Sequence, residues 1–226
     1  MIVWIVSYPR SGNSLTRQIL KRCFGTGSYS YPPTAKPEVD NFSHVTGSAF
    51  FAGSGDELLA AARADAATWF VKTHLTEAPR EGERLLYVVR DARAAMASFR
   101  RFQRNMLGRE FSLEQIVQGK PPLPSWSAHA DWALARPAET TLLLRYEALV
   151  QPTPALLDQI SGFIGLPALR PFDVSFEQVR ALRPQLCEVG RNGPGIEEIE
   201  ANCPDLFWTL HGETMRRLGY EKRPAR

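Results

Sequence analysis

Cysteine is scarce in this sequence, and long hydrophobic runs are missing. The cysteines Cys23, Cys187 and Cys203 are odd in number and unrelated in spacing, which indicates neither a disulfide framework nor a metal site. No stretch approaches the roughly 20 apolar residues of a membrane span, and the N-terminal apolar run is too short for a signal peptide. We therefore expect a cytoplasmic protein with no membrane span and no bound metal.

A strong charge of either sign is also missing. The formal net charge is +3, which gives no reason to expect a nucleic-acid partner. The 226 residues are 44% hydrophobic and 23% charged, as in an ordinary globular protein. We expect one domain over residues 1–226, because a chain of this length buries about 70% of its unfolded surface. The oligomeric state cannot be read from these features.

Strand-like and helix-like segments alternate along the chain. Short apolar runs rich in β-branched and aromatic residues predict strands, and apolar residues at helical spacing predict helices. The predicted strands are 2–7, 68–72, 85–90 and 141–145, and the predicted helices are 14–23, 92–107, 152–165 and 205–218. This alternation predicts an α/β fold with a central parallel sheet covered by helices on both faces.

Two segments show no clear pattern. Residues 25–55 are rich in glycine, serine, proline and aromatic residues, and residues 119–125 contain three prolines and indicate a loop. A long irregular segment in an α/β domain is often functional. The aromatic residues of 25–55 could line an acceptor pocket, or they could anchor the segment to the core.

The first predicted strand ends in SYPRSGNS, residues 7–14. Gly12 would let the backbone approach a ligand closely, Ser11, Asn13 and Ser14 add polar donors, and Arg10 adds a positive charge. The N–H groups of the following helix start have no partners within the helix, so such a turn suits a phosphate or sulfate. The alternative is a plain strand–helix turn with an N-cap serine. The turn is not a Walker A loop, because G-x-x-x-x-G-K-[ST] is missing.

Other polar residues follow the next predicted strands. VKTHL places Lys72 and His74 at one strand end, and YVVRDARAAMASF places Arg90 at another, with Ser98 about two turns into the next helix. The carboxyl ends of parallel strands meet at one edge of a sheet, where ligands bind. A strand-end arginine suits a phosphate. The nearby Arg100, Arg101 and Arg104 are expected on a solvated helix face.

Together these elements resemble the PAPS-dependent sulfotransferase family. SYPRSGNS, VKTHL, YVVRDARAAMASF and LLLRYEAL occur in the family's order, and GRNGPG at 190–195 is similar to its C-terminal Arg-Lys-Gly element. The resemblance spans about residues 2–195. It implies a P-loop-like three-layer fold, sulfuryl transfer from the co-substrate PAPS (3′-phosphoadenosine 5′-phosphosulfate), and no metal.

The resemblance also implies a role for each matching residue. His74 would be the general base, and Lys72 and Arg10 would assist catalysis beside the sulfuryl group. The donor-binding residues would be Arg10, Ser11, Gly12, Asn13, Ser14, Arg90, Ser98, Tyr146, Arg191, Asn192 and Gly193. Leu15 stands where many members have an adenine-stacking aromatic residue, so the stacking group is unknown. Asn192 replaces the central lysine of the C-terminal element, which weakens that contact.

Two other functions remain open at this point. A P-loop-type kinase would use ATP and magnesium, but it needs Lys-Ser/Thr at the loop end and an acidic metal ligand after a strand. A catalytically inactive nucleotide-binding protein would have no reason to keep Arg10, Lys72, His74, Arg90 and Ser98 together. The acceptor of the sulfotransferase could be a hydroxyl or an amine of a small molecule, a glycan or a peptide.

Overall fold

The computed structural model describes residues 1–33, 46–174, 178, 181 and 193–221. The chain divides into two compact units. The first unit comprises Met1–Ser7, Gly12–Val89 and Arg136–Asp173, and the second comprises Tyr8–Ser11, Arg90–Ala135 and Val174–Arg226. The turn after the first strand thus belongs to the second unit as far as Ser11 and to the first unit from Gly12 onward.

The first unit is built on a parallel sheet. Its strands are β1 (Ile2–Val6), β2 (Tyr29–Ser30), β3 (Trp69–Thr73), β4 (Arg84–Val89) and β5 (Thr141–Arg145), in the spatial order β2-β3-β1-β4-β5. Every neighbouring pair is parallel. All five residues of the central strand β1 are buried, as expected for a parallel strand covered on both faces. The predicted parallel sheet is confirmed.

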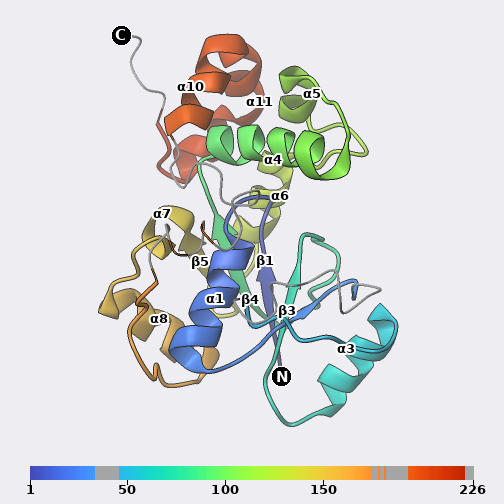
Figure 1. Ribbon diagram of the computed structural model, residues 1–226, viewed down its shortest axis with the longest axis vertical. Coiled ribbons are helices and arrows are strands. Elements are labelled where there is room, and N and C mark those ends of the chain that lie inside the picture. Colours follow the sequence, from blue (N-terminus) through green and yellow to red (C-terminus); the bar gives the residue numbers. More distant parts are fainter. Residues whose placement is uncertain (34–45, 175–177, 179–180, 182–192, 222–226) are drawn as a thin grey trace. The chain divides into compact units, whose positions relative to one another are not determined.

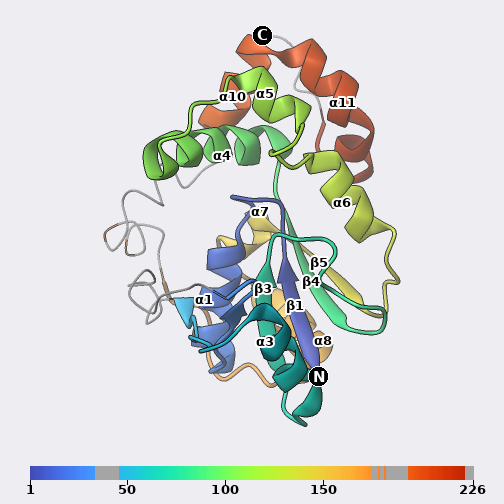
Figure 2. The same cartoon turned by 90° about the vertical axis from the view of Figure 1, so that its right-hand side faces the viewer.

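Helices cover the two faces of this sheet (Figures 1 and 2). α1 (Asn13–Phe24) and α8 (Pro154–Ile164) pack on one face. α3 (Gly55–Ala64) lies on the other face, where its Arg63 Nε donates to Glu83, and Glu83 accepts a hydrogen bond from Trp4. The short helix α7 (Tyr146–Leu149) directly follows β5.

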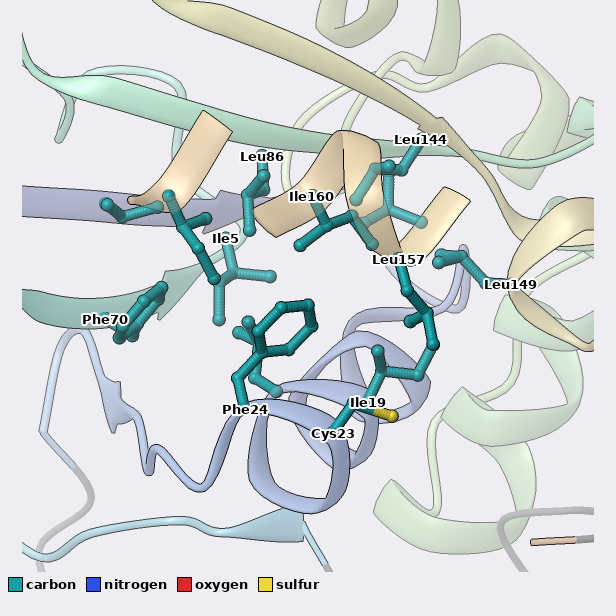
Figure 3. Packing of buried hydrophobic residues seen from close by; sticks show 14 residues of the cluster. Ile5, Ile19, Cys23, Phe24, Phe70, Leu86, Leu144, Leu149, Leu157 and Ile160 are labelled. Carbon is teal, nitrogen blue, oxygen red and sulfur yellow. The ribbon is translucent and has the colours of Figure 1, made fainter. Parts of the chain in front are cut away.

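The core of the first unit lies between the sheet, α1 and α8. Figure 3 shows Ile19 and Phe24 of α1 and Leu157 and Ile160 of α8 meeting side chains of the strands. The strand side chains of this cluster are Val3, Ile5, Phe70, Leu86, Val88 and Leu144. Each fully buried side chain of this size contributes about 1.5–3 kcal/mol. This burial fixes β1 and α1, and therefore the two ends of the turn between them.

The second unit is helical in its described part. Its helices are α4 (Ala92–Leu107), α5 (Leu113–Gln118), α6 (Trp126–Leu134), α10 (Gly193–Asn202) and α11 (Pro204–Arg217). α4 packs against α10, and α11 packs against α5 and α6. The buried His211 of α11 joins them, because its Nε2 donates to Val117 O at 2.8 Å and its Nδ1 lies 2.9 Å from Ser127 Oγ. Burial lowers the pKa of His211.

The predicted elements agree closely with these bounds. The four predicted strands are displaced by at most one residue at either end, and the four predicted helices by at most two. The sequence patterns did not reveal β2, α3, α5, α6, α7 and α10. Within the described residues no helix is long and apolar enough to cross a membrane.

Two glycines of α8 offer a matched test of its C-terminus. Gly162 lies inside the helix and Gly165 caps it at φ 74°, and a Cβ on either would meet nothing within 4 Å. Gly162→Ala should raise the free energy of unfolding by about 0.5–1 kcal/mol, because alanine loses less backbone entropy. Gly165→Ala should lower it by about 1 kcal/mol, because left-handed backbone is strained in L-residues. Urea denaturation measures both, and shifts of the same sign would contradict the assigned helix end.

Candidate functional site

Gly12 shapes the part of the turn that belongs to the first unit. Its backbone is left-handed, with φ 119° and ψ 10°, directly before α1. A Cβ at this position would lie 2.9 Å from Cδ2 of Tyr146 and 3.3 Å from Cγ1 of Val88. Conformation and space therefore both require glycine here. The side chain that packs against Gly12 belongs to Tyr146, a residue predicted to lie near the adenine.

The start of α1 provides polar groups for an anion. No acidic side chain lies in the first turn, and no side chain caps the helix, so the partial positive charge of its N–H groups is not offset there. Asn13 is buried and its Nδ2 donates to Thr73 O at 3.2 Å. Its Oδ1 is buried with no hydrogen-bond partner among the described residues. Ser14, the next residue of the helix, is exposed.

His74 is oriented by a backbone carbonyl. It follows β3, and its Nδ1 lies 2.7 Å from the carbonyl oxygen of Ser7. Because a carbonyl only accepts, Nδ1 must be the protonated nitrogen, and the neutral imidazole then has its lone pair on Nε2. Nδ2 of Asn13 lies 3.4 Å from the same Nδ1. The tautomer with the proton on Nδ1 and the lone pair on Nε2 is the one that a general base requires.

Lys72 lies two residues before His74, at the penultimate position of β3. Its side chain is partly exposed, and its backbone carbonyl accepts from Tyr31 N at 2.7 Å. In the sheet, Lys72 is aligned with Ile5 of β1 and Ser30 of β2. The strand thus fixes the backbone of Lys72 near the carboxyl end of the sheet.

Arg10, Arg90 and Ser98 meet within the second unit. Nη1 of Arg90 donates to the carbonyl of Arg10 at 3.1 Å, and Nε of Arg10 donates to Oγ of Ser98 at 3.3 Å. The Arg10 guanidinium also lies 5.2 Å from the ring centroid of Phe102, one turn after Ser98 on α4. Arg10 is thus in direct contact with two residues that lie 80 and 88 positions later in the chain.

Ser11 and Arg10 complete the loop in this unit. Ser11 is fully buried, and its Oγ has no hydrogen-bond partner among the described residues. Its N–H donates to Tyr8 O at 3.2 Å. Arg10 has a left-handed backbone, with φ 67°, which is unusual for a residue other than glycine. Strained backbone of this kind occurs often at ligand sites.

The remaining predicted residues are less informative. Arg191 and Asn192 lie outside the described residues, and Gly193 is the first residue of α10. Among the described residues, no cluster of three histidine, cysteine or acidic side chains could hold a metal ion. The described cysteines, Cys23 and Cys203, are buried free thiols.

Three groups that contact the candidate residues were not identified from the sequence. The carbonyls of Ser7 and Thr73 hold His74 and Asn13, and every residue has such a carbonyl, so no sequence signal identifies them. Phe102 could have been found, because it lies four residues after Ser98 and therefore on the same helix face.

Solved structures share this fold at low sequence identity. Mouse sulfotransferase SULT7A1, crystallised with PAP, matches with a TM-score of 0.65 and 18% identity over 96% of this chain and 88% of its own. Retinol dehydratase, in complex with androsterone and the inactive cofactor PAP, also scores 0.65, with 15% identity over 99% of this chain and 82% of its own. The sulfotransferase domain from the curacin biosynthetic pathway scores 0.58, with 17% identity over 98% of each chain.

The sequence itself was compared with proteins and with protein families. A search among curated proteins gave no match. The model of the sulfotransferase domain family, in contrast, matches residues 2–186, which include the turn after β1, His74, Arg90, Ser98 and Tyr146. The chain therefore belongs to the sulfotransferase domain family.

Proposed function

We propose that this protein is a PAPS-dependent sulfotransferase that moves the sulfuryl group to a hydroxyl or amine acceptor. The observation that carries the proposal is the 2.7 Å contact between His74 Nδ1 and the Ser7 carbonyl, which leaves the lone pair of neutral His74 on Nε2. A sulfotransferase needs a base for the acceptor proton at this point. A protein that only binds nucleotides gains nothing from it.

The polar groups of the turn fit the anionic ends of PAPS. The buried Ser11 Oγ and Asn13 Oδ1 lack partners among the described residues, and the first turn of α1 contains no acid. We assign Ser11, Gly12, Asn13 and Ser14 to the 5′-phosphosulfate, and Arg90 and Ser98 to the 3′-phosphate, as the family resemblance implies. Arg191, Asn192 and Gly193 are proposed to close over the 3′-phosphate, and Tyr146 to lie near the adenine.

The reaction transfers one group and one proton. The acceptor oxygen or nitrogen attacks sulfur in line, the bond between sulfur and the bridging oxygen breaks, and PAP leaves with that electron pair. His74 Nε2 takes the acceptor proton, a contribution typically worth about 10²- to 10⁴-fold. Lys72 and Arg10 are proposed to offset the negative charge that develops on the transferred group and the leaving phosphate.

The proposed acceptor class is a small molecule. Retinol dehydratase, which shares the fold, was crystallised in complex with the small molecule androsterone. Glycan and peptide acceptors are alternatives to be tested beside it. The proposed location is the cytoplasm, where the thiols of Cys23 and Cys203 stay reduced.

Calorimetric titration tests the donor first. The protein should bind PAP and show little binding of ADP with magnesium, because ADP lacks the 3′-phosphate to which Arg90 and Ser98 are assigned. A preference for ADP with magnesium would favour a kinase. Binding of neither nucleotide would favour a protein without this activity.

Replacing His74 tests the assignment of the base. His74→Ala should lower turnover at least about 100-fold, measured as release of PAP from PAPS with a panel of phenols and aliphatic alcohols. Its affinity for PAP should stay within about threefold of the wild type, since the base binds the acceptor proton and not the nucleotide. Near-normal turnover in this variant would show that another group accepts the proton, even if the donor is correct.

Gly12→Ala tests the turn, with Gly82→Ala as a matched control. Both glycines have positive φ, 119° and 80°, but a Cβ at Gly82 would meet nothing within 4 Å. Each variant should lose about 1–2 kcal/mol of stability from backbone strain. Only Gly12→Ala should also weaken PAP binding, by about tenfold or more, because its Cβ collides with Tyr146 and displaces the donors beside it. Equal PAP affinity in the two variants would remove Gly12 from the site.

A further inference from the structure

Arg93, in the first turn of α4, is one of the most buried charged residues of the second unit. Its side chain is 3% exposed and makes a two-pronged ion pair with Asp91, with Nε to Oδ1 at 3.0 Å and Nη2 to Oδ2 at 2.7 Å. Nη1 donates to Glu200 of α10. The guanidinium lies 5.2 Å from the ring centroid of Trp208, and Nη2 donates to the carbonyl of Glu221 at 3.3 Å.

Glu200 is held from two sides as well. Its carboxylate accepts from Arg93 and from Nε1 of Trp208, at 3.2 Å and 3.3 Å for the two oxygens. Buried ion pairs add little net stability compared with apolar side chains, because both charges must leave water, and their attested use is to fix one arrangement among several. The main effect of Arg93 and Glu200 is therefore to fix the arrangement of the elements they join, and their contribution to the stability of the fold is small.

The network ends next to the proposed 3′-phosphate residues. Asp91 is the N-cap of α4, and its Oδ1 accepts from Arg93 N at 3.0 Å. Asp91 is joined by a peptide bond to Arg90, whose Nη1 reaches the Arg10 carbonyl. Holding Asp91 thus holds the backbone from which Arg90 projects and the first turn of the helix that carries Ser98.

The same network ties α10 to α4. Gly195 packs so tightly on α4 that a Cβ would lie 2.9 Å from Ala94 Cα and 3.2 Å from Ala97 Cβ. On the next turn, Glu198 accepts from Arg100 at 3.1 Å and from Arg101 at 2.8 Å. Arg104 is exposed, as expected for a solvated face, whereas Arg100 and Arg101 are only partly exposed because they pair with Glu198. Gly193, the first residue of α10, belongs to the C-terminal element assigned to the donor.

We propose that Arg93 and Glu200 are positioning residues for recognition of the donor's 3′-phosphate. They hold α4 against α10. The distance between Gly193 at the start of α10 and the pair Arg90 and Ser98 at α4 then stays at a value that fits a 3′-phosphate. This inference rests on the proposed use of PAPS. It goes further by making donor selection depend on a network that touches neither the sulfuryl group nor the acceptor.

The test compares two nucleotides that differ only in the 3′-phosphate, PAP and AMP. Calorimetry on the full chain gives the ratio of their affinities for the wild type, Glu200→Gln and Gly195→Ala. Glu200→Gln removes the charge that pairs with Arg93, and Gly195→Ala separates the helices sterically while favouring helix formation. Each should reduce the ratio about 2- to 30-fold, the range of coupling through such networks. The AMP affinity should change less than twofold.

Asp131→Asn is the matched control. Asp131 of α6 accepts from Arg217 at 2.9 Å and from Thr214 Oγ1, both on α11, so the variant weakens a carboxylate contact in the same unit that does not involve α4. It should lower the unfolding temperature but leave the ratio of PAP to AMP affinity unchanged. Unfolding temperatures of all variants show that each is folded during the titration.

The outcomes separate the inference from the function it rests on. A wild type that binds PAP no better than AMP would overturn the proposed donor. A wild type that prefers PAP, with Glu200→Gln and Gly195→Ala leaving the ratio unchanged, would overturn the positioning role alone. The positioning role is also overturned if Asp131→Asn lowers the ratio as much as Glu200→Gln, because the network would then act only through stability.

Discussion

The structure depends on a short turn that holds left-handed backbone at two residues, Arg10 and Gly12. This conformation costs an L-residue about 1–2 kcal/mol, so the turn persists only where its surroundings fix it. The buried strand β1 leads into it, and α1 leaves it packed on the core through Ile19 and Phe24. Arg90 secures the carbonyl of Arg10, and Tyr146 fills the space beside Gly12. Burial of apolar side chains thus offsets the strain that shapes the polar loop.

Apolar patterning was sufficient to predict the frame of the fold. β1 and β4 are almost fully buried and appear as continuous apolar runs, and the partly buried β3 and β5 contain shorter apolar runs, so all four were found within one residue. β2 was missed because two residues are too short for a pattern. α3 and α5 were missed although both begin with a capping box, Ser54 with Glu57 and Ser112 with Gln115. These serine-to-acid or serine-to-amide spacings were available in the sequence as helix-start signals.

The sequence proposed residues for the site but could not indicate their contacts. Positions at or just beyond predicted strand ends suggested Lys72, His74 and Arg90, and their roles stay predictions. The groups that orient side chains here are largely backbone carbonyls, those of Ser7, Arg10 and Thr73, and no letter of the sequence marks a carbonyl. For Arg100 and Arg101 of α4, the sequence did not indicate that a side chain would pair with them. Their partner Glu198 lies 97 or 98 positions away, a pairing that only the packing of α10 on α4 creates.

The proposed base and the proposed 3′-phosphate residue Arg90 lie beside different kinds of contact. In the first unit, the Nδ1 atom of the proposed base His74 lies 2.7 Å from the carbonyl oxygen of Ser7, just before the start of the turn. In the second unit, Arg90 begins a segment fixed by the buried charges of Asp91 and Arg93, and Arg93 pairs in turn with the partly exposed Glu200. Charge networks have few alternative arrangements at similar energy, because breaking one pair leaves an uncompensated buried ion. We therefore expect a substitution in this network to act first on the backbone that carries Arg90. Under the proposed roles, such a substitution changes the selectivity for the donor through the second unit alone.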